Sequence, residues 1–121
     1  MHELSVATNI VRLACEAVEN AGSDDQVASV KVRIGALAGI VTESLLFAWD
    51  VAAEGTRCEH AQIQIEEAPG KIKCPSCEQI TVLSHPPRFV CTFCGTKSGD
   101  VVAGHELDIL SLELADEPTN A

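Results

Sequence analysis

The chain has 121 residues with a formal net charge of −10, and Trp and Phe together supply only four aromatic side chains. This length fits one ordinary domain, or one core with a small appendage. No apolar run is long enough to span a bilayer, the N-terminus lacks the basic-then-apolar pattern of a signal peptide, and the acidic balance repels phosphate backbones. We therefore expect neither membrane insertion nor a nucleic-acid partner.

Two helices and a strand are predicted in the first half of the chain. Apolar residues at three- and four-residue spacing predict a helix over 4–21, closed by Gly22. Alternating apolar and basic residues over 30–34 predict a strand with one solvent-exposed face. Thr42 is expected to be the N-cap of a second helix that runs to about Glu54. The buried face of this second helix is expected to contain Leu45, Leu46, Trp49, Ala52 and Ala53.

Two further strands flank a cysteine-rich segment. Alternation over 62–66 predicts the second strand, which Pro69-Gly70 ends. The cysteine-rich segment runs from there to about Gly99, and a last strand is expected over 104–114. The alternation shifts near Ile109-Leu110, which predicts either a β-bulge or coverage of both strand faces at that point.

Two cysteine pairs carry the strongest chemical signal in the chain. Each pair has two residues between its thiols, and thirteen residues separate the pairs: Cys74-Pro75-Ser76-Cys77 and Cys91-Thr92-Phe93-Cys94. This spacing lets two turns direct four sulfurs to one point, which suits tetrahedral zinc. Disulfides or unrelated buried thiols are the alternatives. A four-sulfur site has no open coordination position, so the zinc is expected to be structural rather than catalytic.

The compartment follows from the same cysteines. The chain has six cysteines, four of them in paired motifs, and shows no export signal. This combination is typical of metal binding in a reducing compartment rather than of a disulfide framework. We therefore expect a cytoplasmic protein.

The order of elements predicts an α+β fold. Helix, strand, helix, strand, cysteine insert and strand give a two-layer, three-stranded sheet with two helices, plus an inserted small zinc-ribbon-like lobe. The lobe is expected over 70–100, and the α+β domain over 1–69 with 101–121. The lobe has four basic and two acidic side chains, which leaves four basic and sixteen acidic side chains for the rest. Such an acidic body suits a cation, a basic partner, or solubility alone.

A weaker signal lies at the start of the chain. The α-amine of Met1, the backbone nitrogen of His2 and its imidazole can close two chelate rings around a metal, and nitrogen-rich tetragonal sites favour Ni(II) or Cu(II). Glu3 adds a carboxylate or its own backbone nitrogen. An exposed histidine with no ligand role is the alternative.

Three features together resemble the HypA/HybF family of hydrogenase-maturation nickel chaperones. They are M-H-E-L-S at the start, V-x-V-R-I-G-A-L-A-G at 30–39, and the doubled C-x2-C pairs. The resemblance covers nearly the whole chain. It implies nickel at Met1, His2 and Glu3, and zinc held by Cys74, Cys77, Cys91 and Cys94.

The resemblance also implies a role and partners. It implies a non-enzymatic metallochaperone that inserts or delivers Ni(II) to the large-subunit precursor of a [NiFe] hydrogenase, together with a HypB-type nickel GTPase; some relatives also serve urease. The nickel-binding domain would then be 1–69 with 101–121, and weak homo-oligomerisation stays open. Some family members carry a carboxylate in the loop after the first strand, but this chain has no acid between Ala38 and Glu43.

The remaining candidates have weaker signals. Cys15 is expected to be a small buried side chain in the first helix, and Cys58 with His60 makes a poor metal site beside Arg57. His85 and His105 are expected on the surface. The sequence has no Ser-His-acid set, phosphate loop or paired carboxylates, so an enzyme is not expected. The rival functions are a zinc-ribbon protein-interaction or transcription-related module without nickel cargo, and an enzyme subunit or regulator with structural zinc only.

Overall fold

The computed structural model describes residues 3–115 and divides the chain into two compact units. The helix unit comprises Met1–Val32, Ile40–Glu66 and Asp108–Ala121, and the cysteine unit comprises Arg33–Gly39 and Glu67–Leu107. The chain therefore passes from one unit to the other four times. Within residues 3–115, neither helix combines the length and apolarity that crossing a membrane requires.

Helix α1 spans Glu3–Asn20, as the apolar spacing predicts. Its buried residues follow that spacing: Val6, Ala7, Ile10, Val11, Ala14 and Val18. The helix ends in a Schellman motif, in which the N–H of Ser23 donates to the carbonyl of Val18 and the N–H of Gly22 to that of Glu19. Gly22 has a φ of 75°, which explains the glycine at this position.

Helix α2 spans Thr42–Ala53, but Thr42 is not its N-cap. Val41 holds that position with no side-chain cap, and its carbonyl accepts the N–H of Leu45. The N–H of Val41 donates to the Glu3 carboxylate at 3.1 Å. A side chain from α1 therefore accepts the backbone N–H of the N-cap residue of α2. The two residues are far apart in the chain, so the local sequence around α2 does not predict this bond.

The predicted buried face of α2 is confirmed at Leu45, Trp49 and Ala53 and is wrong at Leu46. Its buried residues are Leu45, Ala48, Trp49 and Ala53, whereas Leu46 is exposed and Ala52 half-buried. Trp49 fixes the orientation of the helix, because its indole N–H donates to the carbonyl of Ala61 at 2.9 Å. With Trp49 inward and α2 packed on α1, Leu46 falls outside the buried stripe.

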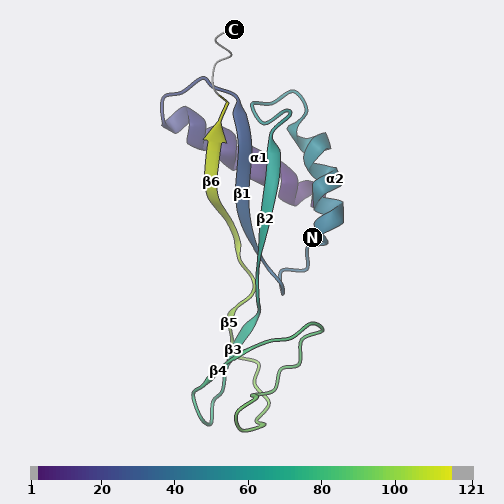
Figure 1. The fold of residues 1–121 in the computed structure, drawn as a ribbon, viewed down its shortest axis with the longest axis vertical. Helices are drawn as coiled ribbons and strands as arrows, with labels where there is room; N and C mark the ends of the chain where they lie inside the picture. The colour runs from purple at the N-terminus through teal and green to yellow at the C-terminus, as the bar shows by residue number, and fades with distance from the viewer. Residues whose placement is uncertain (1–2, 116–121) are drawn as a thin grey trace. The chain divides into compact units, whose positions relative to one another are not determined.

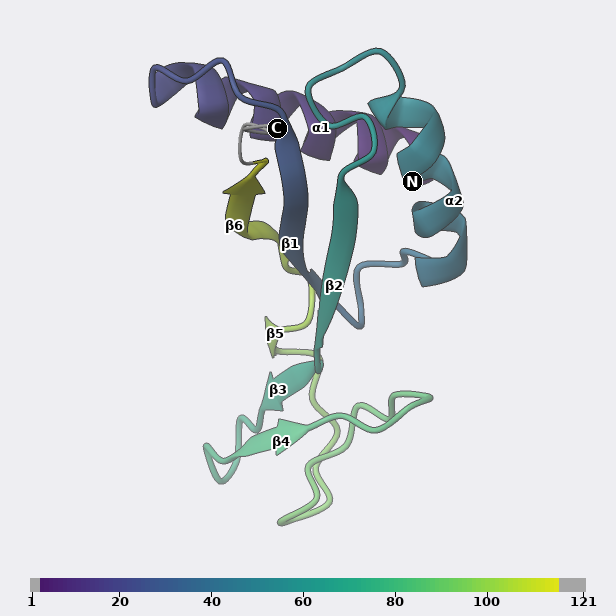
Figure 2. The same ribbon diagram turned by 45° about the horizontal axis from the view of Figure 1, so that its top comes forward.

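The first sheet has the order β2-β1-β6. Strand β1 (Val27–Gly35) is central, and β2 (Gln62–Ala68) and β6 (Leu107–Leu114) flank it. Figure 1 and Figure 2 show α1 running behind these strands, which gives the predicted two layers. Burial is greatest in the central strand, where Val30 and Val32 are inaccessible to solvent.

The predicted strand over 104–114 is confirmed as β6, but it begins later, at Leu107. A short strand that was not predicted, β5 (Val101–Ala103), precedes it, and Gly104, with a φ of 126°, lies between the two. Of the two explanations for the shifted alternation in β6, burial of both strand faces is wrong, because Leu110 and Leu114 are exposed. The burial pattern changes phase after Ile109, as a bulge would produce.

A second antiparallel sheet, in the order β4-β3-β5, forms the frame of the cysteine unit. Strand β3 (Lys71–Lys73) is central and pairs with β4 (Ile80–Val82) and β5. Ile72 is fully buried between Thr81 and Val101, its partners on the two sides. The sheet is small, which fits a ribbon-like lobe whose stability depends on a further element, such as a metal.

Three glycines meet around Leu37 in the same unit. A Cβ on Gly35 would lie 2.0 Å from the carbonyl oxygen of Gly104, and one on Gly104 would lie 2.8 Å from Cα of Gly70. The backbone of Leu37 joins this contact, since its N–H donates to the carbonyl of Gly104 at 2.7 Å. Gly35 and Leu37 belong to the sequence motif at 30–39, and close backbone approach is the physical reason for its first glycine.

Candidate metal centre

The first cysteine pair lies on the turn that joins β3 to β4. The N–H of Cys74 donates to the carbonyl of Gln79, and the N–H of Glu78 donates back to the carbonyl of Cys74. Inside this turn, the N–H groups of Ser76 and Cys77 point at the Cys74 sulfur, at 3.4 Å and 3.5 Å. Glu78 closes the turn with a φ of 64°, in the left-handed region.

The second cysteine pair repeats this geometry. The N–H of Cys91 donates to the carbonyl of Thr96, and the N–H of Gly95 donates to the carbonyl of Cys91. The N–H of Phe93 points at the Cys91 sulfur at 3.4 Å. Gly95 has a φ of 81°, so the residue after each pair is left-handed. The second turn uses glycine there, whereas the first uses glutamate.

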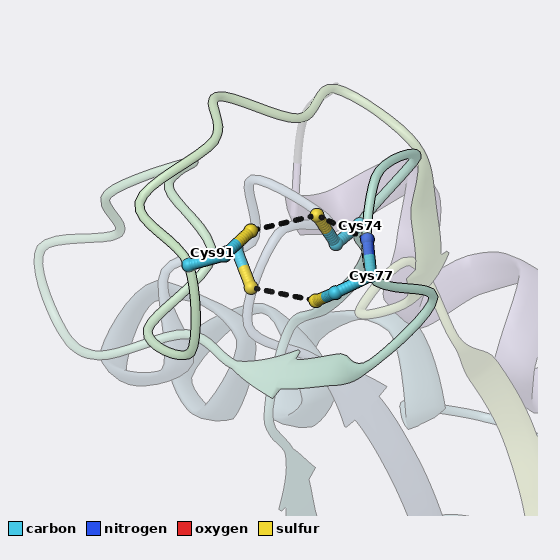
Figure 3. A group of neighbouring side chains, drawn as sticks. Cys74, Cys77 and Cys91 are labelled. Atoms are coloured by element: carbon cyan, nitrogen blue, oxygen red, sulfur yellow. Dashed lines mark hydrogen bonds between the residues drawn. The ribbon is translucent and has the colours of Figure 1, made fainter.

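The two turns bring four sulfurs together. All four lie within 4.8 Å of one another, with Cys74 to Cys94 at 3.4 Å and Cys77 to Cys91 at 3.6 Å. In Figure 3 the sulfurs of the labelled Cys74, Cys77 and Cys91 face a common point. A tetrahedron with Zn–S bonds of 2.3 Å has S···S edges of about 3.8 Å, so the cluster has the size that zinc requires.

The disulfide alternative is wrong, because these cysteines are free thiols at separations far above a disulfide bond. Cys74 and Cys91, the first cysteine of each pair, are buried, whereas Cys94 is exposed. One side of the cluster is therefore sealed by the lobe, and the other faces solvent.

Within each pair, backbone N–H groups favour the thiolate of the first cysteine. The N–H of Cys77, helped by that of Ser76, lowers the pKa of Cys74 to about 6 against the opposing effect of burial. Burial also opposes ionisation of Cys91, but the N–H groups of Cys94 and Phe93 keep its pKa below the ordinary value.

Cys77 behaves in the opposite way. The N–H of Gln79 favours its thiolate, but burial and the neighbouring thiols Cys91 and Cys74 outweigh this effect and raise the pKa of Cys77 to about 12. The cluster therefore retains protons while it lacks a cation, because close thiolates repel one another. A divalent metal would displace those protons and stabilise the thiolates. Four thiolates match zinc and leave no position for a substrate.

The predicted nickel residues lie at the edge of the described structure. Met1 and His2 are outside residues 3–115, so the described residues do not include most of that chelate. Glu3 is the first residue of α1, and one of its carboxylate oxygens accepts the N–H of Val41. The N-terminal motif is thereby connected to the start of α2.

The other candidate residues do not form a metal site. Cys15 is half-buried and lines an open hollow of about 1060 Å³, together with His60. Cys58 is fully buried. Its pKa is raised to about 12, mainly because burial disfavours the thiolate, and further because of the charge of Cys15 and a hydrogen bond with it. Among residues 3–115, only the four zinc-type cysteines form a cluster of potential ligands. His85 and His105 are exposed.

The proximity of Cys15 and Cys58 had no signal in the sequence, since it depends on how α1 meets the loop after α2.

Known proteins share this arrangement of sequence and fold. A family model described as "Hydrogenase/urease nickel incorporation, metallochaperone, hypA" matches residues 1–114. The hydrogenase maturation factor HypA of Chloroflexus aggregans is 43% identical over 113 residues, which cover 93% of this chain and 98% of that protein. HypA of Roseiflexus sp. is 40% identical over 121 residues, which cover 100% and 98%. The solution structure of the Ni metallochaperone HypA from Helicobacter pylori has a TM-score of 0.66 at 26% identity and covers 97% of this chain and 100% of its own.

Proposed function

This chain belongs to the HypA family of hydrogenase and urease nickel-incorporation metallochaperones, and from that membership we propose that it delivers Ni(II) to the large-subunit precursor of a [NiFe] hydrogenase. One observation carries the proposal. The family match begins at residue 1 and continues to residue 114, so it includes both the Met1-His2-Glu3 motif and the four clustered cysteines. The chain would act as a carrier rather than as an enzyme.

We assign the cargo site to the first three residues. The α-amine of Met1, the backbone nitrogen of His2 and the His2 imidazole supply the nitrogen donors that Ni(II) prefers. Glu3 lies beside them, and its hydrogen bond to Val41 holds it at the start of the helix unit. A carrier must release its cargo, and a site of few ligands at a chain terminus suits exchange better than an enclosed cage.

We assign the four cysteines to a resident structural zinc ion. Their sulfur separations and donor chemistry fit that ion, and the ion would supply positive charge that four converging thiolates need. Cys74 and Cys91 would anchor it from the buried side of the lobe, and Cys77 and Cys94 from the solvent side. The zinc-binding function is proposed for residues 70–100, and the nickel-binding function for 1–69 with 101–121.

The charge distribution supports the proposed partners. The helix unit has fourteen acidic and three basic side chains, whereas the cysteine unit has four acidic and five basic ones. An acidic surface attracts cations and basic protein surfaces and repels nucleic acids. We propose a HypB-type nickel GTPase and the hydrogenase precursor as partners, and the cytoplasm, where free thiols persist, as the compartment.

A transfer experiment tests delivery. The zinc-loaded, untagged chain is loaded with one equivalent of Ni(II) and mixed with metal-free large-subunit precursor, with and without the GTPase and GTP. We expect nickel to move to the precursor, and His2→Ala to prevent the movement. Retention of nickel by the chain under all these conditions would contradict delivery. A chain that binds no nickel would instead support the rival function, a zinc-ribbon interaction module without cargo.

A further inference from the structure

Helix α2 presents an apolar face to solvent. Phe47 is 75% exposed, Val51 52% and Leu46 43%, and Val41, the N-cap, is 56% exposed. Phe47 and Val51 are four residues apart, so they lie next to each other on one side of the helix. We propose that this face, Leu46, Phe47 and Val51 with Val41, docks a partner helix whose apolar side is flanked by basic residues.

The core does not explain this face. Leu45, Ala48, Trp49 and Ala53 already bury the opposite stripe of α2, and Trp49 is fixed by its hydrogen bond to Ala61. Scattered single apolar residues on a surface are ordinary, but several on adjoining helical turns mark an interaction surface. Phe47 is the most exposed side chain of the face, and an exposed aromatic ring is a typical anchor for a partner.

Charge identifies the kind of occupant. Glu43 and Asp50 lie one turn on either side of Phe47, Glu54 lies one turn beyond Asp50, and residues 42–54 contain no Lys or Arg. The helix unit as a whole has a net charge of −11. A second copy would bring two such acidic faces together, and anionic lipid would be repelled in the same way. Basic side chains would instead pair with the three carboxylates while apolar side chains cover Phe47 and Val51.

The location of the face connects it with the cargo. The Glu3 carboxylate binds the N–H of Val41 at 3.1 Å, so the face begins where the N-terminal motif meets α2. Leu4, the residue after Glu3, is also exposed. This step rests on the proposed function: a partner seated on α2 would lie beside Glu3, one of the three residues to which we assign nickel.

Two synthetic helical peptides test the proposal by isothermal titration calorimetry with the full, zinc-loaded chain. Both peptides carry the same Leu and Phe side; one has Lys and the other Glu on the remaining positions. We expect the Lys peptide to bind, and the Glu peptide not to bind. Two variants should each lower the affinity for the Lys peptide about tenfold or more: Phe47→Ser, and the double change Glu43→Lys with Asp50→Lys. Phe89→Ser, which removes an exposed aromatic ring from the cysteine unit, should leave binding unchanged.

Three results would overturn the proposal: no binding of the Lys peptide, equal affinity for Phe47→Ser and the parent chain, or a Phe47-dependent dimer in analytical ultracentrifugation. The last would assign the face to a second copy. Nickel titration of the same preparations separates this proposal from the proposed function. A chain that binds nickel but shows no Phe47-dependent peptide binding contradicts the docking face alone, and one that binds the peptide but no nickel contradicts the cargo role alone.

Discussion

The four cysteines of the metal centre occupy different environments although their spacing is symmetrical. Cys74 and Cys91 are buried, and backbone N–H groups lower the pKa of both thiols. Cys94 is exposed and Cys77 half-buried. The first cysteine of each pair is therefore held by the fold, whereas the second depends more on the metal for its position. Loss of zinc is expected to affect the two kinds of cysteine differently, but no single cysteine is dispensable for a four-sulfur site.

Cys94→Ser should remove the zinc although Cys94 contributes little to packing. We expect the zinc content to fall from about one ion per chain toward zero, because a hydroxyl is a poor replacement for a thiolate. Plasma mass spectrometry of the purified protein measures this content. Cys15→Ser, which changes a half-buried thiol of α1, is the matched control and should retain the ion. Full zinc content in Cys94→Ser would show that the cluster is not the zinc site.

Cys58 should resist alkylation in the folded chain. Its pKa is raised from 9.0 to about 12, first by burial and then by Cys15, so its thiolate at pH 8 should be roughly a thousandfold rarer than in the unfolded chain. Iodoacetamide labelling followed by peptide mass spectrometry, with and without denaturant, measures the difference. The protonated thiol contributes its stability below a pH of about 9, and that contribution is lost as the pH rises toward 12. Equal labelling rates in the folded and denatured chains would contradict this environment.

At this scale the sequence predicts what is local. The C-x2-C spacing and Gly95 predict the cysteine turns, since ligand direction and backbone conformation are set within a few residues. The sequence does not predict the left-handed Glu78, which has no glycine to mark it, nor the contact of Cys15 with Cys58, which depends on tertiary packing. The order in which the four thiols ionise also depends on three-dimensional N–H positions.

At the scale of elements, the turns after the two cysteine pairs can be compared directly. Both closing residues are left-handed, but Glu78 has a Cβ and Gly95 does not. Glu78→Gly should stabilise the lobe and Gly95→Ala should destabilise it, each by about 1 kcal/mol, because a left-handed residue with a side chain costs that much. Chelator competition for zinc measures both changes, since the metal affinity reports the stability of the lobe. Equal effects of the same sign would contradict the shared geometry of the turns.

The glycine contact around Leu37 gives a second prediction for the cysteine unit. Gly35→Ala would place a Cβ 2.0 Å from the backbone oxygen of Gly104, which cannot move as a flexible side chain would. We expect destabilisation by about 3 kcal/mol or more. Gly99→Ala is the matched control: Gly99 has no heavy atom within 4 Å of the added Cβ, and it should change stability by less than about 0.5 kcal/mol. Thermal unfolding measures both variants, and a stable Gly35→Ala would contradict the close approach.

Element boundaries were predictable where periodicity was strong. The six buried residues of α1 and its terminal glycine define that helix, and the alternation around Val32 defines β1. The buried face of α2 was predicted only in part, because apolar residues occupy both sides of this helix and the position of Trp49 decides which side is buried. The separation of β5 from β6 was also hidden, since it occurs at Gly104, whose backbone contacts with Gly35 and Gly70 depend on tertiary structure.

At the scale of the molecule, two units with different compositions share one chain. The helix unit is strongly acidic and has an apolar face on α2, whereas the cysteine unit is near neutrality and contains the metal centre. This distribution supports a division of labour in which one unit carries the cargo and meets a basic partner, and the other is folded around zinc. The difference in composition is visible in the sequence, because the two C-x2-C pairs and most of the acidic residues lie in different stretches of it.

The central claim, a nickel site made by the N-terminus itself, is tested most directly by nickel titration of three zinc-loaded chains: the untagged parent, His2→Ala, and a chain extended by Gly-Ser before Met1. Met1 is expected to be retained, because methionine removal generally requires a small second residue. We predict tight binding by the parent alone, weakening as the pH falls from about 8 toward 6 because the α-amine must lose its proton. Zinc content and circular dichroism should be equal in all three chains. If the extended chain binds nickel as tightly as the parent, the amine is not a ligand and the proposed chelate is wrong.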